Sequence, residues 1–88
     1  MYKIEYHRDV RKDIQKLKQS NLMSKVNFLI EVVKNNPFQN PPPYEKLLGE
    51  LENYYSRRIN IQHRMVYQVF EKENIVRILS LWSHYENI

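Results

Sequence analysis

The side chains best suited to chemistry in this 88-residue chain are carboxylates, arginines and one late histidine. In chain order they are Glu45 just after three prolines, the adjacent Arg57 and Arg58 within a β-favouring run, Arg64 at the start of the next run, and His84-Tyr85 after the last. A carboxylate can take the proton of a 2′-hydroxyl, guanidinium groups can stabilise a pentavalent phosphorane, and an imidazole can protonate a leaving 5′-oxygen. Together these residues could form the centre of a metal-free ribonuclease.

Each of these residues also has a structural interpretation. Glu45 could be a solvated loop carboxylate, and His84 an exposed histidine near the end of the chain. Arg57 and Arg58 could be cross-strand salt-bridge partners. Residue types alone therefore leave both interpretations open.

Composition excludes several other chemistries. The chain has no cysteine, so it has no disulfide, no cysteine-based metal site and no thiol nucleophile. Its single glycine, Gly49, cannot supply a dinucleotide fingerprint or a phosphate-binding P-loop. The three histidines, His7, His63 and His84, lack the spacing that places two metal ligands on one helix face. We therefore expect neither a cofactor nor a metal.

Hydropathy and length favour a single domain over residues 1–88. The longest apolar stretches lie on either side of Glu31 and are far too short to span a membrane. The first residues lack the apolar stretch of a signal peptide. We expect a soluble cytoplasmic protein with no membrane partner.

Positive charge is concentrated in the N-terminal part of the chain. Lysine and arginine outnumber aspartate and glutamate by 14 to 10, and the whole excess of +4 lies in residues 1–36. Such a basic half is typical of a protein whose partner carries phosphates or many carboxylates. A solvated basic helix face is an equally good interpretation.

The elements that position these residues follow from hydrophobic periodicity. Alternation over residues 2–6 predicts a short strand, and apolar spacing predicts helices over residues 8–18 and 21–35. Ser20 or Asn21 would provide the cap of the second helix, and Asn36-Pro37 would end it. The short link between the helices favours an antiparallel hairpin.

The C-terminal half reads as strands. The prolines of residues 41–43 favour a stiff, extended and structural connection, with peptide recognition as the less favoured alternative. Short β-favouring runs follow at residues 45–48, 54–60, 64–70 and 75–82, which predicts an antiparallel meander. The last run has apolar residues at both odd and even positions, so both of its faces should be buried and the strand is expected to be central. The fold class is therefore α+β, with a short N-terminal strand and a two-helix hairpin packed on one face of a mainly antiparallel sheet.

The other face of this sheet is where a site is expected. Because neighbouring strand residues point to opposite faces, Arg57 and Arg58 must project to different sides. Burying an arginine against the helices is costly unless it is paired. The open face should therefore carry at least one guanidinium.

Several linked motifs resemble one known family. Tyr-Tyr-Ser-Arg-Arg-Ile (54–59), His-Arg-Met-Val-Tyr (63–67), the late Ser-His-Tyr (83–85) and Asn-Pro-Phe after two helices are similar to the YoeB/Txe branch of RelE-like toxins. The resemblance implies a RelE-like fold and a ribosome-dependent mRNA endonuclease, the toxin of a toxin–antitoxin pair, which cuts the codon in the ribosomal A site and so inhibits translation. It also implies a cognate antitoxin, a ribosome carrying mRNA as partner, and a possible homodimer.

The resemblance assigns a role to each candidate residue. Glu45 matches the general base, Arg64 the phosphate-stabilising arginine, His84 the general acid, and Tyr85 the aromatic residue that orients the substrate. Arg57 and Arg58 match paired arginines, of which at least one should contact RNA phosphate.

The chain also departs from the family pattern. A lysine usual three residues after the glutamate is replaced here by Leu48, and Lys46 could supply that cation from another direction. Tyr55 stands where tryptophan is frequent, and three residues follow Tyr85. A non-catalytic RNA-binding, ribosome-binding or antitoxin-paired module of the same fold is the alternative function, and a small scaffold for an acidic partner is a third.

Overall fold

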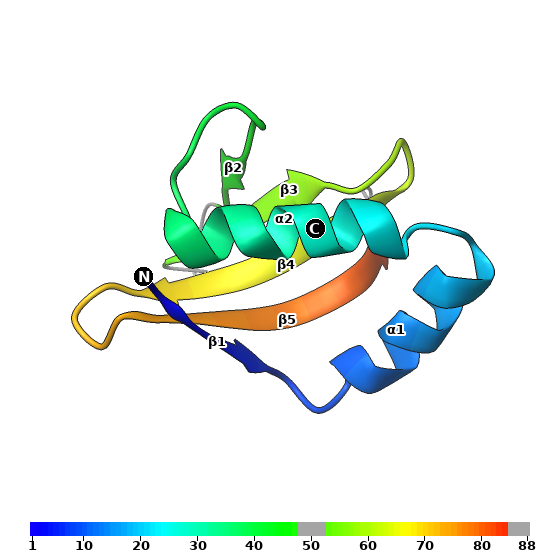
Figure 1. Ribbon diagram of the computed structural model, residues 1–88, viewed down its shortest axis with the longest axis horizontal. Helices are drawn as coiled ribbons and strands as arrows, with labels where there is room; N and C mark the ends of the chain where they lie inside the picture. The colour runs from blue at the N-terminus through cyan, green and yellow to red at the C-terminus, as the bar shows by residue number, and fades with distance from the viewer. Residues whose placement is uncertain (48–52, 85–88) are drawn as a thin grey trace.

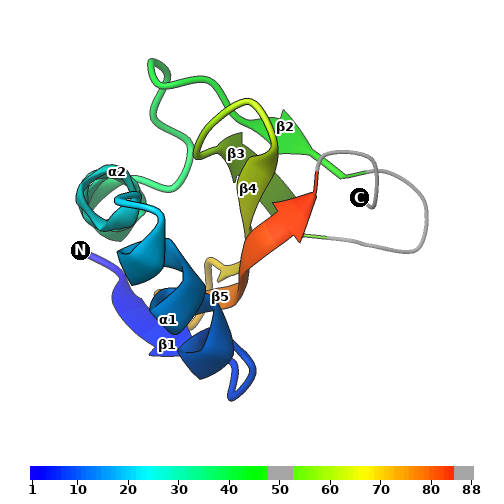
Figure 2. The same cartoon turned by 90° about the vertical axis from the view of Figure 1, so that its right-hand side faces the viewer.

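The computed structural model describes residues 1–47 and 53–83 with their side chains, and the backbone of His84. In these residues the elements are β1 (Lys3–Tyr6), α1 (Val10–Gln19), α2 (Met23–Asn35), β2 (Glu45–Lys46), β3 (Tyr54–Arg58), β4 (His63–Phe70) and β5 (Ile75–His84). The strands form one sheet in the order β1-β5-β4-β3-β2, and both helices lie on one face of it (Figures 1 and 2). The predicted α+β class and arrangement are confirmed.

The sheet is antiparallel from β2 through β5, as the predicted meander requires. The first strand, β1, instead runs parallel to β5. The prediction that the last strand is central is wrong, because β4 occupies the centre and β5 lies between β4 and β1.

The misleading apolar pattern of β5 has a physical cause. The pairing of β5 with β4 shifts register on both sides of Val66, and such irregularities change which side chains face the core. Val76 and Ile78 are fully buried at even positions, whereas Leu81 is fully buried at an odd one. Beyond the irregularity, Leu81 therefore belongs to the core although its position along the strand is odd and those of Val76 and Ile78 are even.

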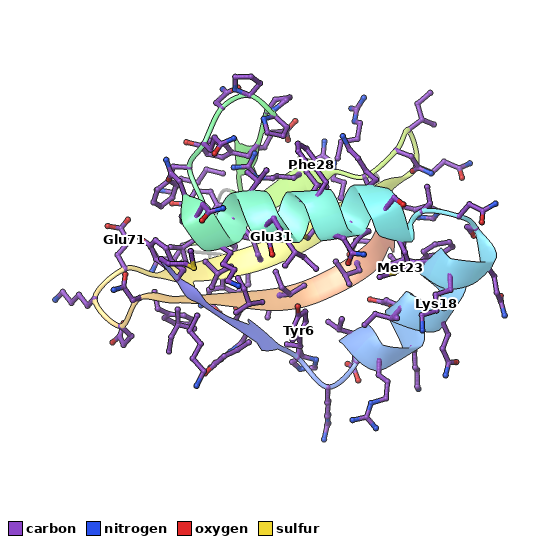
Figure 3. The ribbon with its side chains drawn as sticks, viewed as in Figure 1. Tyr6, Lys18, Met23, Phe28, Glu31 and Glu71 are labelled. Atoms are coloured by element: carbon purple, nitrogen blue, oxygen red, sulfur yellow. The ribbon has the colours of Figure 1, made fainter. Side chains whose placement is uncertain are left out.

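The hydrophobic core lies between the helices and the sheet. Two residues of α1, Val10 and Leu17, and three of α2, Val26, Leu29 and Val33, are fully or almost fully buried in it. Alternate residues of β4 complete it: Met65, Tyr67 and Val69. Charged residues such as Lys18 stay exposed on the outer side of α1 (Figure 3). The amphipathic spacing seen in the sequence is therefore the packing pattern of both helices.

The start of α2 differs from the prediction. Asn21 has φ 58° and turns the chain through the left-handed region, which asparagine tolerates better than most residues. The cap position falls on Leu22, and no side chain caps the helix. The expected cap from Ser20 or Asn21 is therefore wrong.

The end of α2 follows the prediction. Asn36 adopts an extended backbone (φ −159°, ψ 106°), as a residue before proline should. Its side-chain Oδ1 accepts a hydrogen bond from the Phe38 N–H at 3.0 Å. Neither helix is long and apolar enough to cross a membrane, as judged over the residues described.

Candidate active site

The candidate active site lies on the face of the sheet without helices. Glu45 of β2 pairs with Ser56 of β3, and Arg58 of β3 pairs with Arg64 of β4. Since side chains alternate along a strand, these four residues share one face, while Met65 and Tyr67 point into the core. Sheet register therefore gathers residues that are up to 19 positions apart in the chain.

Arg64 holds the carboxylate of Glu45 through both terminal nitrogens. Nη1 donates to Glu45 Oε2 at 3.1 Å, and Nη2 donates to Oε1 at 3.2 Å. Nη1 also donates to Ser56 Oγ at 2.7 Å. This two-pronged contact fixes the orientation of the carboxylate as well as its position.

The two members of this ion pair differ in exposure. The Arg64 side chain is 5% exposed, whereas that of Glu45 is 58% exposed. A cavity of about 300 Å³ opens beside them, lined by Pro43, Tyr44, Glu45, Ser56, Arg58 and Arg64. A ligand entering this cavity would meet an accessible carboxylate backed by two guanidinium groups.

The charges of the site keep Glu45 ionised. Its hydrogen bonds from Arg64 lower the pKa of the Glu45 carboxyl below the ordinary value of 4.5, and burial opposes this with a smaller effect. The positive charges of Arg64 and Arg58 lower the pKa further. At neutral pH Glu45 is therefore a carboxylate that can accept a proton.

Arg57 has a different environment from Arg58. Arg58 is exposed and lines the cavity, whereas Arg57 is 1% exposed on the opposite face of β3. The guanidinium of Arg57 donates hydrogen bonds to Tyr67 and to backbone carbonyls of residues 37–42. The structure thus places one arginine on each face, and only Arg58 is accessible to RNA phosphate in this conformation.

The other predicted site residues are less closely connected to Glu45. Lys46 is exposed and pairs with Tyr55, so it lies on the opposite face of β2 from Glu45. The backbone of His84 ends β5 and pairs with His63, which precedes Arg64. Tyr85 and Leu48 lie outside the described residues.

Two further residues of the site region had no role in the sequence interpretation. Ser56 contacts Arg64 directly, and Tyr67, which is fully buried, contacts Arg57. Burial raises the pKa of the Tyr67 phenol to about 12, and the nearby Arg57 reduces this effect. Ser56 lies two residues before Arg58, so the sequence alone indicated that both side chains share one face of a strand. The register of β3 with β2 and β4 was needed to show that this face carries the site.

The described residues contain no group of three histidine, aspartate or glutamate side chains that could hold a metal ion. The chemistry that this arrangement supports directly is proton transfer to Glu45 and stabilisation of negative charge by Arg58 and Arg64.

Comparison with known proteins agrees with the fold and identifies a family. Residues 6–85 match the family described as "YoeB-like toxin of bacterial type II toxin-antitoxin system". The toxin YoeB of Synechocystis sp. is 35% identical over 65 residues, which cover 74% of this chain and 73% of that protein.

Solved structures give the same relationship. The YoeB–YefM complex from Staphylococcus aureus contains a chain that superposes with a TM-score of 0.77 at 33% identity, covering 97% of this chain and 99% of that one. The YoeB dimer from Staphylococcus aureus superposes with a TM-score of 0.80 at 32% identity, covering 96% and 98%. With its family match extending across nearly the whole sequence, the chain belongs to the YoeB-like toxins of bacterial type II toxin–antitoxin systems.

Proposed function

We propose that this toxin is a ribosome-dependent mRNA endoribonuclease that cuts the codon in the ribosomal A site and so inhibits translation. The observation that carries the proposal is the pairing of Glu45 with Arg64 and Ser56 beside a cavity that Arg58 also lines. A carboxylate poised as a proton acceptor next to cationic hydrogen-bond donors matches what cleavage by a 2′-hydroxyl requires.

In the proposed mechanism, Glu45 removes the proton of the 2′-hydroxyl, whose oxygen then attacks the adjacent phosphorus. Arg64 and Arg58 stabilise the charge of the phosphorane, and His84 protonates the departing 5′-oxygen. Tyr85 orients the substrate beside that acid. The products are a 2′,3′-cyclic phosphate, or its hydrolysed form, and a free 5′-hydroxyl, and no metal or cofactor takes part.

Substrate binding would strengthen Glu45 as a base. In the free protein its pKa is lowered chiefly by hydrogen bonds from Arg64. A phosphate in the cavity would compete with the carboxylate for the same guanidinium, which weakens that lowering. The proton affinity of Glu45 would therefore rise when the substrate is in place.

The basic N-terminal part provides a reason for ribosome binding. The excess charge of residues 1–36 lies in β1, α1, α2 and their connections. Contacts of lysine and arginine with phosphates release counterions, so the affinity for ribosomes should fall steeply with added salt.

We also propose a cognate antitoxin as protein partner and the bacterial cytoplasm as the site of action. The family description and the YoeB–YefM complex of a related protein support this partnership. The dimer of the Staphylococcus aureus relative supports a homodimer as a further assembly. Size-exclusion chromatography of the purified chain, alone and with the product of a short neighbouring reading frame, tests both assemblies.

The decisive experiment is cleavage on programmed ribosomes. Purified toxin is mixed in excess with ribosomes carrying a defined mRNA, and the new 5′ ends are mapped at single-nucleotide resolution. We expect cuts in the A-site codon, and loss of these cuts in Glu45→Gln. Glu71→Gln is the matched control, because Glu71 is an exposed carboxylate in the turn between β4 and β5 (Figure 3).

Ribosome binding without new 5′ ends would refute nuclease activity and establish the alternative, a non-catalytic ribosome-binding module. Cleavage by Glu45→Gln at the rate of the wild type would refute the role of Glu45 while leaving the activity itself intact.

A further inference from the structure

Arg57 is a permanently charged side chain with almost no contact with water. It is 1% exposed, and arginine does not lose its proton in proteins. Burial of such a charge is costly unless every donor finds an acceptor. The groups that accept hydrogen bonds from Arg57 therefore indicate which part of the structure this buried charge stabilises.

Its partners are the carbonyls of the proline segment, which we define as residues 37–44. Nη2 donates to the carbonyl oxygens of Pro37 at 3.0 Å and Gln39 at 2.8 Å, and Nη1 donates to that of Pro42. The Tyr44 ring lies 5.0 Å from the guanidinium carbon, within reach of a cation–π interaction. One side chain thus contacts both ends and the middle of the segment.

Tyr67 extends this clamp. Its hydroxyl accepts a hydrogen bond from Arg57 Nε at 3.1 Å and donates one to the Pro37 carbonyl at 2.9 Å. Tyr67 is fully buried in the central strand β4, so it connects the segment to the middle of the sheet. The prolines themselves have no N–H with which to pair. Side-chain donors therefore supply the hydrogen bonds that tie these carbonyls to the sheet, in addition to the packing of the Phe38 and Tyr44 rings against Tyr55.

The segment leads directly into Glu45. The strand that carries this residue, β2, has only two residues and lies at the edge of the sheet. Among the described residues it pairs with β3 through Glu45 with Ser56 and Lys46 with Tyr55, and the next residue, Leu47, donates one further backbone hydrogen bond to Tyr54. So short a ladder offers little resistance to a slip, and a slip of one residue would turn Glu45 to the other face.

We propose that Arg57, together with Tyr67, is a positioning residue that holds the proline segment so that Glu45 enters β2 opposite Ser56 and within reach of Arg64. The proposal rests on the proposed role of Glu45 in catalysis. It also gives the two adjacent arginines separate tasks, since Arg58 faces the cavity and Arg57 faces the segment.

The position of Arg57 in β3 couples the proline segment closely to the site. The preceding residue, Ser56, accepts the hydrogen bond of Arg64 on the site face. The same stretch of backbone therefore holds the segment on one face and the partner of Glu45 on the other. If the segment moves, the distance from Glu45 to Arg64 changes. A misplacement of about 1 Å at a reacting group can reduce a rate by about 10²-fold.

The test compares Arg57→Met, Arg57→Lys and the control Arg77→Met. Arg77 lies on β5 and is exposed, and its side chain donates a hydrogen bond to Glu5, outside the site. The first measurement is a carbon-13 NMR titration of the Glu45 carboxyl in each folded protein. We expect the pKa of Glu45 to rise in Arg57→Met, because the Glu45 carboxylate loses its placement beside Arg64. The pKa should rise less in Arg57→Lys and stay unchanged in Arg77→Met.

The second measurement is single-turnover mRNA cleavage on ribosomes as a function of pH. For Arg57→Met we expect the rate at saturating ribosomes to fall about 10²-fold, with an almost unchanged ribosome concentration at half-saturation. We also expect the loss of rate on the acidic side of the pH profile, where the general base becomes protonated, to begin at a higher pH. Arg57→Lys should recover part of the rate. A purely structural role would lower the unfolding temperature without moving the pKa or the pH profile of the folded protein.

The two measurements separate this proposal from the proposed function. If the wild type does not cleave, the function fails, but the NMR titration still decides the role of Arg57. Folded Arg57→Met with the wild-type Glu45 pKa overturns the proposal. Should Arg57→Met not fold, Tyr67→Phe removes only the bridging hydroxyl, and a smaller rise of the Glu45 pKa is then the expected result, with no change overturning the proposal.

Discussion

Arg64 contacts Glu45 with two separate nitrogens, a geometry that lysine cannot reproduce. The variant Arg64→Lys keeps the charge but cannot present two nitrogens to one acceptor, so it loses at least one hydrogen bond that Arg64 would donate to the phosphorane of the proposed mechanism. A hydrogen bond to a charged group contributes about 1.5–3 kcal/mol, and about 1.36 kcal/mol corresponds to a factor of ten in rate. We therefore expect single-turnover cleavage to fall by about 10- to 150-fold in this variant.

The same substitution should lower the free energy of unfolding by about 2 kcal/mol at most. Glu45 is 58% exposed, so water can replace the lost donor, and an ion pair with one exposed partner contributes at most about 1 kcal/mol. Ser56 is buried and also loses its donor, which adds about 1 kcal/mol. The large loss of rate should thus occur in a protein that is still folded at the assay temperature.

The assay is cleavage of a defined mRNA on ribosomes with toxin in excess, alongside thermal unfolding of each variant. Arg77→Lys is the matched control, because Arg77 also pairs with a glutamate, Glu5, at 3.3 Å and outside the site. Folded Arg64→Lys with the wild-type rate would show that the two-nitrogen contact is irrelevant to the reaction. An equal loss of cleavage rate in Arg77→Lys would show that the effect comes from replacing any arginine and not from the contact with Glu45.

Three further outcomes are expected. His84→Ala should bind ribosomes normally and lose cleavage by about 10²- to 10⁴-fold in single-turnover assays; normal cleavage would remove His84 from the mechanism. Because the folded-state pKa of Glu45 is lowered, its contribution to stability is complete above its ordinary pKa of 4.5 and is lost as pH falls through the folded-state value. Denaturant unfolding should accordingly show the stability gap between wild type and Glu45→Gln narrowing below that pH, and a constant gap would contradict the ion pair. Leu29→Ala should reduce the unfolding free energy by about 2–5 kcal/mol, since Leu29 is fully buried between α2 and the sheet, and a loss near zero would contradict its place in the core.

Most of the fold could be predicted from periodicity because the core lies between two layers. In the helices, spacing of three and four residues marks a single buried stripe, as Val26, Leu29 and Val33 show. The start of α2 could not be predicted from residue type, since Asn21 uses its tolerance of positive φ to turn the chain and leaves the cap position to Leu22. The central strand was misjudged because the register shifts opposite Val66 allow residues of both parities in β5 to be apolar.

Glu45, Arg58 and Arg64, which the structure brings together, were named from the sequence, but Ser56 and the contacts among these residues were not. Pleating predicted that Arg57 and Arg58 face opposite sides, yet which one faces the cavity depends on the pairing of β3 with β2 and β4. That pairing is a long-range property, set by packing of the whole sheet. The burial of Arg57 had no sequence signal, because its acceptors are three backbone carbonyls and the Tyr67 hydroxyl rather than an acidic side chain.

The location of the site at a sheet edge explains why so many polar contacts surround one carboxylate. A residue in a central strand such as β4 is held by ladders on both sides, whereas Glu45 lies in a two-residue edge strand with one neighbour. An edge leaves room for a large substrate to approach, but its backbone alone specifies position weakly. Side chains must then supply the missing constraint, from Arg64 on the site face and from Arg57 on the other. The placement of the Glu45 carboxylate therefore depends on two arginines on opposite faces of the sheet, Arg64 and Arg57. Removal of either arginine should displace the carboxylate while the helical core stays intact.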